Sequence, residues 1–368
     1  MLGSCFSLAG CRRELSRTFF TLDTVCTLTV YEGQSTVLNG AVELCTALGQ
    51  KLNSKAENNE IAVLNQTGQL QNASEDLLAV INKGLYYSKL SNGLFDITLG
   101  AVTDLWDFKN QVVPQPDALK AALKTVGWQN LTVAEGGKTV TLKNGARLEL
   151  GAIAKGYIAD RLRDYFLQNG VKNALINLGG NVYALGQNGR KSYTVGVQTP
   201  FETGVIATLP AKNIAVVTSG TYQRGFTQNG VYYHHLLNPK TGMPQNTGYL
   251  SVTVLAKNSV DADALSTLCY LYGEKGPEFI NSLNGVEAVW VNEKKQVSVS
   301  GGLLLNGSSI SFKTRGNSLR LWLIFVANSR AAVKILIALR AESWFFGKAA
   351  ALRFAKRPVV FKLRQYRI

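Results

Sequence analysis

The two histidines of this chain stand side by side, directly before a turn. The segment 232–242 reads YYHHLLNPKTG, and no other histidine occurs in the 368 residues. Histidine is the side chain best suited to move protons near neutral pH. The turn fixes the backbone beside the pair, because Pro239 sets φ and Gly242 tolerates conformations that other residues avoid. His234 and His235 therefore form a candidate proton-transfer site; the alternative is one buried and one exposed histidine on a strand.

A second candidate site lies in the segment DADALST at 261–267. Asp263 and Thr267 are four residues apart, so they share one face if this segment is helical. A carboxylate and a hydroxyl one turn apart offer two oxygens to a hard cation such as Mg²⁺, which usually keeps waters and substrate phosphates as its other ligands. The alternative is purely structural: Asp261 caps the helix, and Thr267 bonds back to the preceding turn.

The segment ELGAIAKGY at 149–157 reads as a strand that turns through small residues into a helix. The first turn of a helix offers unpaired N–H groups to an anion. Lys155 stands there against the usual preference for acidic residues, which indicates a bound phosphate. A solvated surface lysine is the alternative interpretation.

Two further motifs allow both a functional and a structural interpretation. Leu178-Gly179-Gly180-Asn181 ends an apolar strand and is either a turn or a backbone lining for a flat ligand. The segment TSGTYQR at 218–224 carries hydroxyls and an arginine, which serve a phosphate or satisfy a turn.

The net charge of +15 by itself suggests nucleic-acid binding, but most of the excess positive charge lies in one segment at 313–368. Residues 313–368 hold 13 Lys and Arg against one acid, which leaves 26 basic and 23 acidic residues in 1–312. The body of the chain therefore does not bind polyanions by charge, and no nucleic-acid partner is expected. The five cysteines form no C-x-x-C pair, so no structural zinc site is expected either.

The composition divides the chain into three parts. Residues 1–16 contain Ser7-Leu8-Ala9-Gly10-Cys11, which matches the lipobox of bacterial lipoproteins, although no complete signal peptide precedes it. A chance match is the alternative. Residues 17–312 form the main domain. Residues 313–368 mix apolar clusters with regular cations, which is typical either of a basic amphipathic membrane-surface helix or of an extension outside the functional fold.

Strands and helices mix along the main domain without strict alternation, which predicts an α+β fold. Strands are expected at 19–31, 138–142, 146–150, 173–178, 192–198, 204–209, 214–218, 230–237, 250–257, 287–292, 296–300 and 309–312. Helices are expected at 38–52, 57–66, 75–91, 117–126, 152–169 and 261–272.

Taken in chain order, the motifs resemble one family. They are LDT at 22–24, GLFDIT at 93–98, LWDF at 105–108, GAIAKGY at 151–157, NLGGN at 177–181, TSGTYQR at 218–224, HHLLNPKTG at 234–242 and DADALST at 261–267. The series resembles the ApbE family, the FAD:protein FMN transferases, over about residues 17–312. The resemblance implies an α+β fold related to the tunnelling fold, with mixed or antiparallel sheets and packed helices.

The resemblance also implies an activity. Members of that family bind FAD with Mg²⁺, split it at the pyrophosphate, pass FMN to a Ser or Thr hydroxyl of a target protein and release AMP. Targets in the family are membrane-associated redox subunits, such as those of the Rnf complex and the sodium-pumping NADH:quinone reductase. Two alternatives remain open: an Mg²⁺-dependent FAD pyrophosphatase that releases free FMN and AMP, and a non-catalytic flavin-binding lipoprotein.

The resemblance assigns roles to individual positions. His235 falls on the histidine that assists the acceptor hydroxyl. The metal-ligand positions are Ala152, through its backbone carbonyl, Asp263 and Thr267. The FAD-contact positions are Leu22, Leu94, Phe95, Asp96, Glu149, Lys155 and Leu237. Leu22 stands where many relatives have methionine, and Glu149 where aspartate is common. With the lipobox, the family's usual targets lead us to expect a protein on the extracytoplasmic face of the bacterial cell membrane, anchored by lipid on Cys11.

Overall fold

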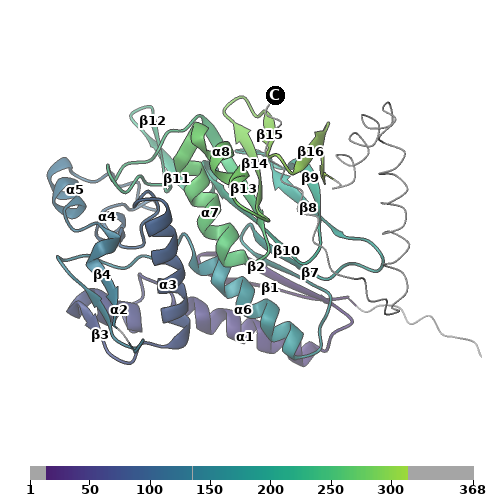
Figure 1. The fold of residues 1–368 in the computed structure, drawn as a ribbon, viewed down its shortest axis with the longest axis horizontal. Coiled ribbons are helices and arrows are strands. Elements are labelled where there is room, and N and C mark those ends of the chain that lie inside the picture. The colour runs from purple at the N-terminus through teal and green to yellow at the C-terminus, as the bar shows by residue number, and fades with distance from the viewer. Residues whose placement is uncertain (1–13, 135, 314–368) are drawn as a thin grey trace, which may run out of the picture. The chain divides into compact units, whose positions relative to one another are not determined.

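An eight-stranded sheet, antiparallel at every pairing, forms the centre of the fold (Figure 1). The computed structural model describes residues 14–134 and 136–313. In spatial order the strands are β1 (Glu14–Thr21), β2 (Thr24–Tyr31), β6 (Ala174–Leu178), β7 (Asn181–Leu185), β10 (Ile214–Gly220), β13 (Tyr249–Ala256), β14 (Glu287–Asn292) and β15 (Val297–Val299). Buried and partly exposed residues alternate along β2. This period of two is expected of a strand that turns one face into the core and leaves the other less buried.

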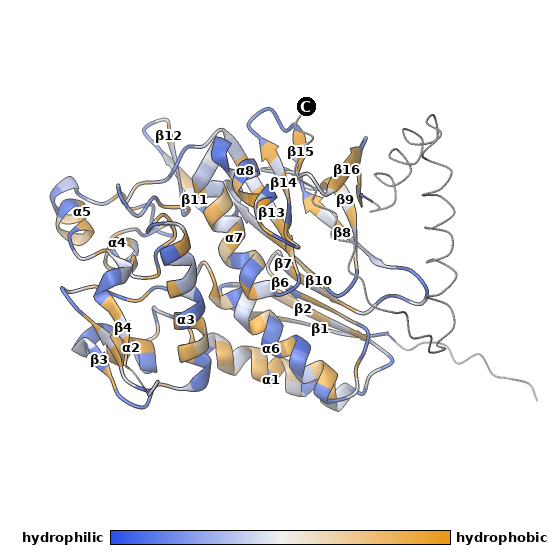
Figure 2. Cartoon of the chain, in the orientation of Figure 1, coloured by the Kyte–Doolittle hydropathy of each residue, from blue (hydrophilic) through white to orange (hydrophobic). Residues whose placement is uncertain are grey.

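Helices pack on one face of this sheet, and a second sheet packs on the other. The helices are α1 (Ser35–Lys51), α6 (Ala154–Gln168), α7 (Ser259–Tyr272) and the short α8 (Gly276–Asn281), and hydrophobic residues fill the strands beneath them (Figure 2). The second sheet has the order β16 (Leu303–Asn306), β17 (Ser309–Phe312), β9 (Val205–Ala211) and β8 (Tyr193–Gln198). Its apolar residues form a separate core with the far face of the large sheet.

A smaller helical region completes the described part of the chain (Figure 1). It contains α2 (Glu60–Thr67), α3 (Glu75–Leu90), α4 (Gly100–Thr103), α5 (Pro116–Leu123) and a three-stranded sheet of β3 (Gln69–Leu70), β5 (Val140–Leu142) and β4 (Leu131–Val133). The hairpin of β11 (Gly225–Gln228) and β12 (Val231–His234) stands apart from the sheets. The α+β prediction is confirmed. No helix in 14–134 or 136–313 is long and apolar enough to cross a membrane.

Three of the expected strands differ from the structure in type or by several residues. The strand expected at 19–31 is the β1–β2 hairpin, because Leu22 and Asp23 both adopt left-handed backbone angles, with φ of 55° and 54°. The strand expected at 146–150 is an extended segment with a single bridge, Leu99 to Arg147. The side chain of Asn65 bonds both the N–H and the carbonyl of Leu148, in place of a neighbouring strand. The strand expected at 230–237 ends at His234.

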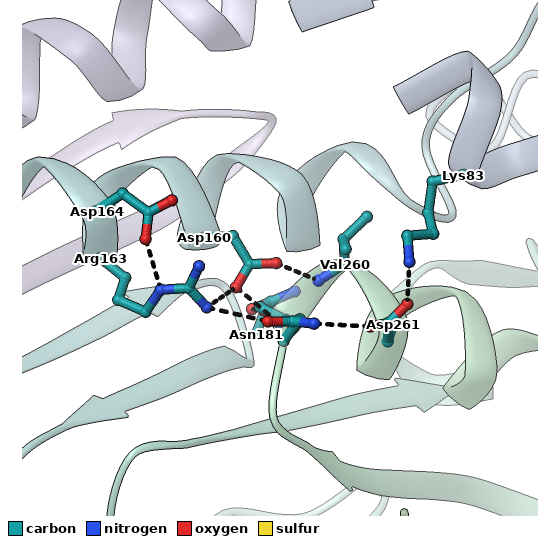
Figure 3. Close-up of polar contacts among 9 residues, drawn as sticks. Lys83, Asp160, Arg163, Asp164, Asn181, Val260 and Asp261 are labelled. Carbon is teal, nitrogen blue, oxygen red and sulfur yellow. Dashed lines mark hydrogen bonds and ion pairs between the residues drawn. The ribbon is translucent and has the colours of Figure 1, made fainter. Parts of the chain in front are cut away.

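Helix α7 begins two residues before the expected start, and its cap comes from another helix. It starts at Ser259, so Asp261 lies in the first turn and is not the N-cap. Asp261 instead pairs with Lys83 of α3 at 2.8 Å (Figure 3). It also accepts the hydroxyl of Tyr87, from the same helix, at 2.8 Å. The Asp160 carboxylate of α6 accepts the backbone N–H groups of Ser259 and Val260, each at 2.9 Å. A tertiary contact has thus replaced the local cap.

The starts of α6 and α7 approach each other closely at Gly156. A Cβ atom there would lie 2.7 Å from both the Cβ of Asp263 and the Cα of Val260, distances that real side chains do not adopt. Glycine is therefore required by packing at this position, although it is a poor helix former.

We expect Gly156→Ala to lower the free energy of unfolding by at least about 1–3 kcal/mol, because the added methyl must push the two helices apart. Urea unfolding monitored by circular dichroism measures this change. Gln168→Ala, on the exposed last turn of the same helix, is the control and should change stability by less than about 0.5 kcal/mol. Equal stabilities of the wild type and Gly156→Ala would contradict the packing argument.

Candidate active site

Asp263 lies where α6 and α7 meet, almost fully buried at 5% exposure. Its Oδ2 accepts the backbone N–H of Gly156 at 2.7 Å. Burial raises the pKa of the Asp263 carboxyl, whereas the positive charge of Lys155, the Gly156 N–H and the Asn181 amide lower it. No ion pair to Asp263 is found in the described part of the chain, so its charge is balanced only by Lys155 at longer range and by these dipoles.

The bond between Gly156 and Asp263 satisfies a free N–H group at the start of α6. Gly156 is the third residue of the helix, so its N–H has no acceptor within the helix and needs one from outside. Ala152 lies before the helix, and its carbonyl receives no hydrogen bond from any described residue. Ala152 itself is partly buried in the turn before α6.

Thr267 lies one turn after Asp263 on α7 and is partly buried. Its Oγ1 lies 3.0 Å from Oγ of Ser219 at the end of β10. The structural alternative, in which Thr267 bonds back to the preceding turn, is not observed among the hydrogen bonds of the described residues. The helix thus presents Asp263 and Thr267 at the spacing that the sequence predicts.

Lys155 is the second residue of α6 and reaches several groups electrostatically. Burial is the main influence on the pKa of Asp263 and of His235, and a bond to Cys45 is the main influence on that of Cys26; the positive charge of Lys155 acts on all three as a smaller cause that lowers the pKa. No acid lies within ion-pair distance of Lys155 among residues 14–134 and 136–313. A cation without an acidic partner at a helix start favours an anionic ligand.

His235 follows β12, and one of its ring nitrogens is fixed by a backbone carbonyl. Nδ1 lies 3.1 Å from the carbonyl of Arg224, which can only accept, so Nδ1 carries the proton and Nε2 keeps a free lone pair. The ring retains some accessible surface, but the surrounding protein lowers its pKa to about 3 by desolvation. The charges of Lys155 and Arg224 lower the pKa further, and the bond to the Arg224 carbonyl opposes them. His235 is therefore a neutral imidazole with one nitrogen available as a base.

His234 has the opposite tautomer and a structural setting. It is buried, and its Nδ1 accepts the N–H of Leu236 at 3.3 Å. The proton therefore lies on Nε2, which faces the hydroxyl of Tyr270 at 3.4 Å. Tyr270 in turn donates to the carbonyl of Gln245 at 2.8 Å. Both nitrogens of His234 are engaged, so only His235 is free to exchange a proton with a ligand.

The flavin-contact residues predicted near Asp96 lie in the loop after α3. Asp96 accepts bonds from the N–H and hydroxyl of Thr98 and from the N–H of Trp128, at 2.7–2.8 Å. Burial raises its pKa, and these donors lower it. Asp96 lines a cavity of about 340 Å³ together with Pro239, from the turn after the histidines. Leu94 packs partly buried against the main core, and Phe95 is 3% exposed within it.

Glu149 lies next to this loop, since its N–H donates to the Ile97 carbonyl at 2.8 Å. Its Oε1 accepts the Ser54 hydroxyl at 3.0 Å and the Gly151 N–H at 2.9 Å. These bonds fix the carboxylate at the entrance to α6.

Leu22 and Leu237 belong to two different hydrophobic clusters. Leu22 lies in the left-handed turn between β1 and β2, and its neighbour Asp23 lies 3.6 Å from the Arg224 guanidinium. Strained backbone of this kind is concentrated at functional sites. Leu237 is 5% exposed and packs with Trp106 and Phe226 in a small separate core.

The structure thus brings together two groups of predicted residues. The first contains Lys155, Asp263 and Thr267 of α6 and α7 and Ala152 of the turn before α6, and the charge of Lys155 extends from there to His235. The second joins Leu94, Phe95, Asp96 and Glu149 through the loop after α3. No direct contact between Asp96 and Asp263 occurs in the described residues.

The sequence did not point to Asp160, and it gave Asn181 and Ser219 no individual role in the site. Asp160 caps α7 and contacts Arg163 at 2.8 Å, and burial raises the pKa of Asp160 to about 6 (Figure 3). Asn181 accepts the Ser259 hydroxyl at 2.6 Å and lies beside Asp263. Asn181 and Ser219 appeared in the sequence only as members of the motifs NLGGN at 177–181 and TSGTYQR at 218–224.

Comparison with known proteins agrees with this fold and arrangement. The model of the ApbE family matches residues 22–290. This chain therefore belongs to the ApbE family.

Individual relatives give the family's activity. An FAD:protein FMN transferase of Treponema pallidum is 34% identical, over 82% of this chain and 91% of that relative. An FAD:protein FMN transferase of Klebsiella pneumoniae is 38% identical, over 58% of this chain and 68% of that relative. The crystal structure of the ApbE protein from Thermotoga maritima has a TM-score of 0.73 and 29% identity, covering 78% of this chain and 97% of that one.

The buried setting of His234 predicts a pH dependence of stability. Burial lowers its pKa to about 4, so between about pH 6.5 and pH 4 the unfolded chain binds a proton that the folded chain does not. The contribution of this residue to stability therefore falls as the pH falls through that window, by up to about 1.4 kcal/mol per pH unit.

We expect His234→Gln to be less stable than the wild type at pH 7.5, and this difference to shrink at pH 5, because glutamine does not titrate. Urea unfolding of both proteins at the two pH values measures the change, and other titrating groups cancel in the comparison. A difference that is constant with pH would show that His234 is not held neutral by the fold.

Proposed function

We propose that this chain is an FAD:protein FMN transferase that cleaves FAD with the help of Mg²⁺. FMN passes to a Ser or Thr hydroxyl of a target redox protein, and AMP is released. The observation that carries the proposal is the gathering of Lys155, Asp263, Thr267 and His235 around the starts of α6 and α7, in a chain whose curated relatives carry this activity.

The donor atoms present at this place suit Mg²⁺. The Asp263 carboxylate, the Thr267 hydroxyl and the Ala152 carbonyl are all oxygens, the ligands that a hard cation prefers. The Ala152 carbonyl accepts no hydrogen bond from a described residue, and no three His, Cys, Asp or Glu side chains cluster anywhere in 14–134 or 136–313. A single carboxylate leaves room for phosphate oxygens and water, as is usual for Mg²⁺. When bound, Mg²⁺ neutralises charge that develops on the phosphates.

The chain's own residues hold the phosphates and the proton. Lys155 attracts the pyrophosphate of FAD to the start of α6. The acceptor oxygen bonds to the phosphorus of the FMN half, and the bond from that phosphorus to the bridging oxygen breaks, so AMP leaves with this oxygen. The Nε2 atom of His235 takes the proton of the acceptor hydroxyl.

Binding of the substrate changes the charge around His235. In the free protein burial is the main cause that lowers the pKa of His235, and the charges of Lys155 and Arg224 lower it further. The negative pyrophosphate offsets these two charges, so their part of the lowering is smaller when the substrate is in place. Leu22, Leu94, Phe95, Asp96, Glu149 and Leu237 are proposed to contact the flavin nucleotide.

The partners and the location are part of the same proposal. We infer that the targets are redox subunits of the Rnf or sodium-pumping NADH:quinone reductase type, met on the extracytoplasmic face of the cell membrane. Lipid on Cys11 would tether the protein there. Cys11 and the basic segment 314–368 lie outside the described residues, so the lipid anchor, the domain boundaries and the role of this segment stay predictions.

One experiment separates transfer from hydrolysis. The protein is mixed with FAD, Mg²⁺ and a candidate redox subunit, and flavin fluorescence of the subunit is recorded after denaturing electrophoresis. Fluorescence on the subunit together with AMP release supports transfer. AMP and free FMN without fluorescent subunit would support a pyrophosphatase, and no cleavage of FAD would support a binding protein.

We expect Asp263→Ala to abolish AMP release from FAD, because the site loses its only carboxylate and with it Mg²⁺. Chromatography of released AMP measures the rate, and circular dichroism checks the fold. Asp261→Ala is the matched control two residues earlier: Asp261 pairs with Lys83, so its loss should lower stability but retain AMP release. Wild-type turnover by Asp263→Ala, or by the wild type in excess EDTA, would exclude this metal site.

We expect His235→Ala to keep the FAD affinity near that of the wild type and to lose transfer by about 10²–10⁴-fold, the usual effect of removing a general base. His234→Ala should affect transfer less, because its nitrogens are engaged within the fold. FAD titration and in-gel fluorescence measure the two quantities separately. If His235→Ala mainly weakens FAD binding, the residue is a wall of the pocket and not the base.

A further inference from the structure

Three hydroxyls and one carbonyl form a continuous hydrogen-bonded chain behind the proposed metal ligands. Ser219, the next-to-last residue of β10, is central to it. Its Oγ lies 2.7 Å from Oγ of Ser266 and 3.0 Å from Oγ1 of Thr267. Ser266 donates in turn to the backbone carbonyl of Asp263 at 2.9 Å. Ser266 is fully buried and Ser219 is 7% exposed, so water does not readily replace these partners.

The direction of the chain is fixed by its last member. A carbonyl only accepts, so the single proton of Ser266 is committed to the Asp263 carbonyl. The contact between Ser219 and Ser266 then needs the proton of Ser219, because otherwise two oxygens would meet at 2.7 Å without a hydrogen. Ser219 has no second proton, so in the contact with Thr267 it accepts and Thr267 donates.

The consequence concerns the oxygen of Thr267. Its proton points to Ser219 on the β10 side, which turns its lone pairs away from that strand. A hydroxyl binds a cation through its lone pairs and repels it through its proton. Outer-shell partners of this kind orient metal ligands in many proteins.

We propose that Ser219 is a positioning residue that holds the Thr267 hydroxyl with its lone pairs available to Mg²⁺. This inference rests on the proposed function, since Mg²⁺ is the group that the lone pairs serve. Ser219, in the TSG segment at 218–220, thus has a role that the flavin-transfer reaction alone does not explain. In Ser219→Ala the proton of Thr267 loses its acceptor and is free to turn toward the cation.

The test measures metal affinity and not turnover. Mn²⁺ serves as a probe of the Mg²⁺ site and is titrated into the full chain while free Mn²⁺ is followed by electron paramagnetic resonance. We expect Ser219→Ala to weaken Mn²⁺ binding about 10- to 100-fold, the usual effect of removing an outer-shell partner. Ser219→Cys, which retains a weak donor and acceptor of similar size, should lose less.

A buried hydroxyl pair elsewhere in the same sheet supplies the matched control. Thr253 of β13 is 1% exposed and contacts the Thr218 hydroxyl at 2.8 Å. Thr253→Val removes this bond without touching Thr267, so it should lower the thermal stability and leave Mn²⁺ affinity unchanged.

The outcomes separate this inference from the proposed function. Tight Mn²⁺ binding by the wild type and equal binding by both Ser219 variants would overturn the role of Ser219 alone. The same holds if Thr253→Val weakens binding as much as Ser219→Ala does. Absence of Mn²⁺ binding by the wild type would overturn the metal site itself, and the role of Ser219 with it. Should Ser219→Ala fail to fold, the comparison of Ser219→Cys with the wild type decides the question.

Discussion

The close crossing of α6 and α7 at Gly156 is the constraint on which the site depends. Without a Cβ, Gly156 lets the first turns of the two helices touch, and its N–H reaches the Asp263 carboxylate. That bond positions the carboxylate of the proposed metal site. The same crossing lets Asp160 of α6 cap α7. Glycine lowers the helix propensity of α6 at this position, and the contacts between the two touching helices offset that loss.

Electrostatics at this crossing favour an anionic ligand. The buried Asp263 and the nearby Lys155 carry opposite charges, yet they make no direct ion pair in the described structure. A directly paired lysine would be satisfied by the protein. Here its charge extends to His235 and to Cys26, so a bound pyrophosphate gains attraction from Lys155 at the helix start, where backbone N–H groups also favour anions.

Most of the fold was predictable from the sequence, as was the placement of Asp263 and Thr267 one turn apart on a single helix, and the failures have physical reasons. Helix and strand periods locate most elements, and the resemblance identifies the family correctly. The period of two continues through Leu22 and Asp23, so nothing in the pattern indicates a left-handed turn between two non-glycine residues. Local rules assign Asp261 to the cap of α7, but Asp160, about a hundred residues earlier, occupies that role. Contacts of this range are decided by tertiary packing, which also explains why Ser219 was not recognised as a partner of Thr267.

The adjacent histidines show why residue type alone does not define a role. Both rings are neutral at physiological pH, since burial is the main cause that lowers each pKa. They differ in the partner of Nδ1: a backbone N–H donates to that atom in His234, and a backbone carbonyl accepts from it in His235. The first leaves the proton on the far nitrogen, facing Tyr270, and the second leaves the far nitrogen bare. One main-chain partner per ring therefore decides which histidine supports the core and which one is able to accept the proton of an acceptor hydroxyl.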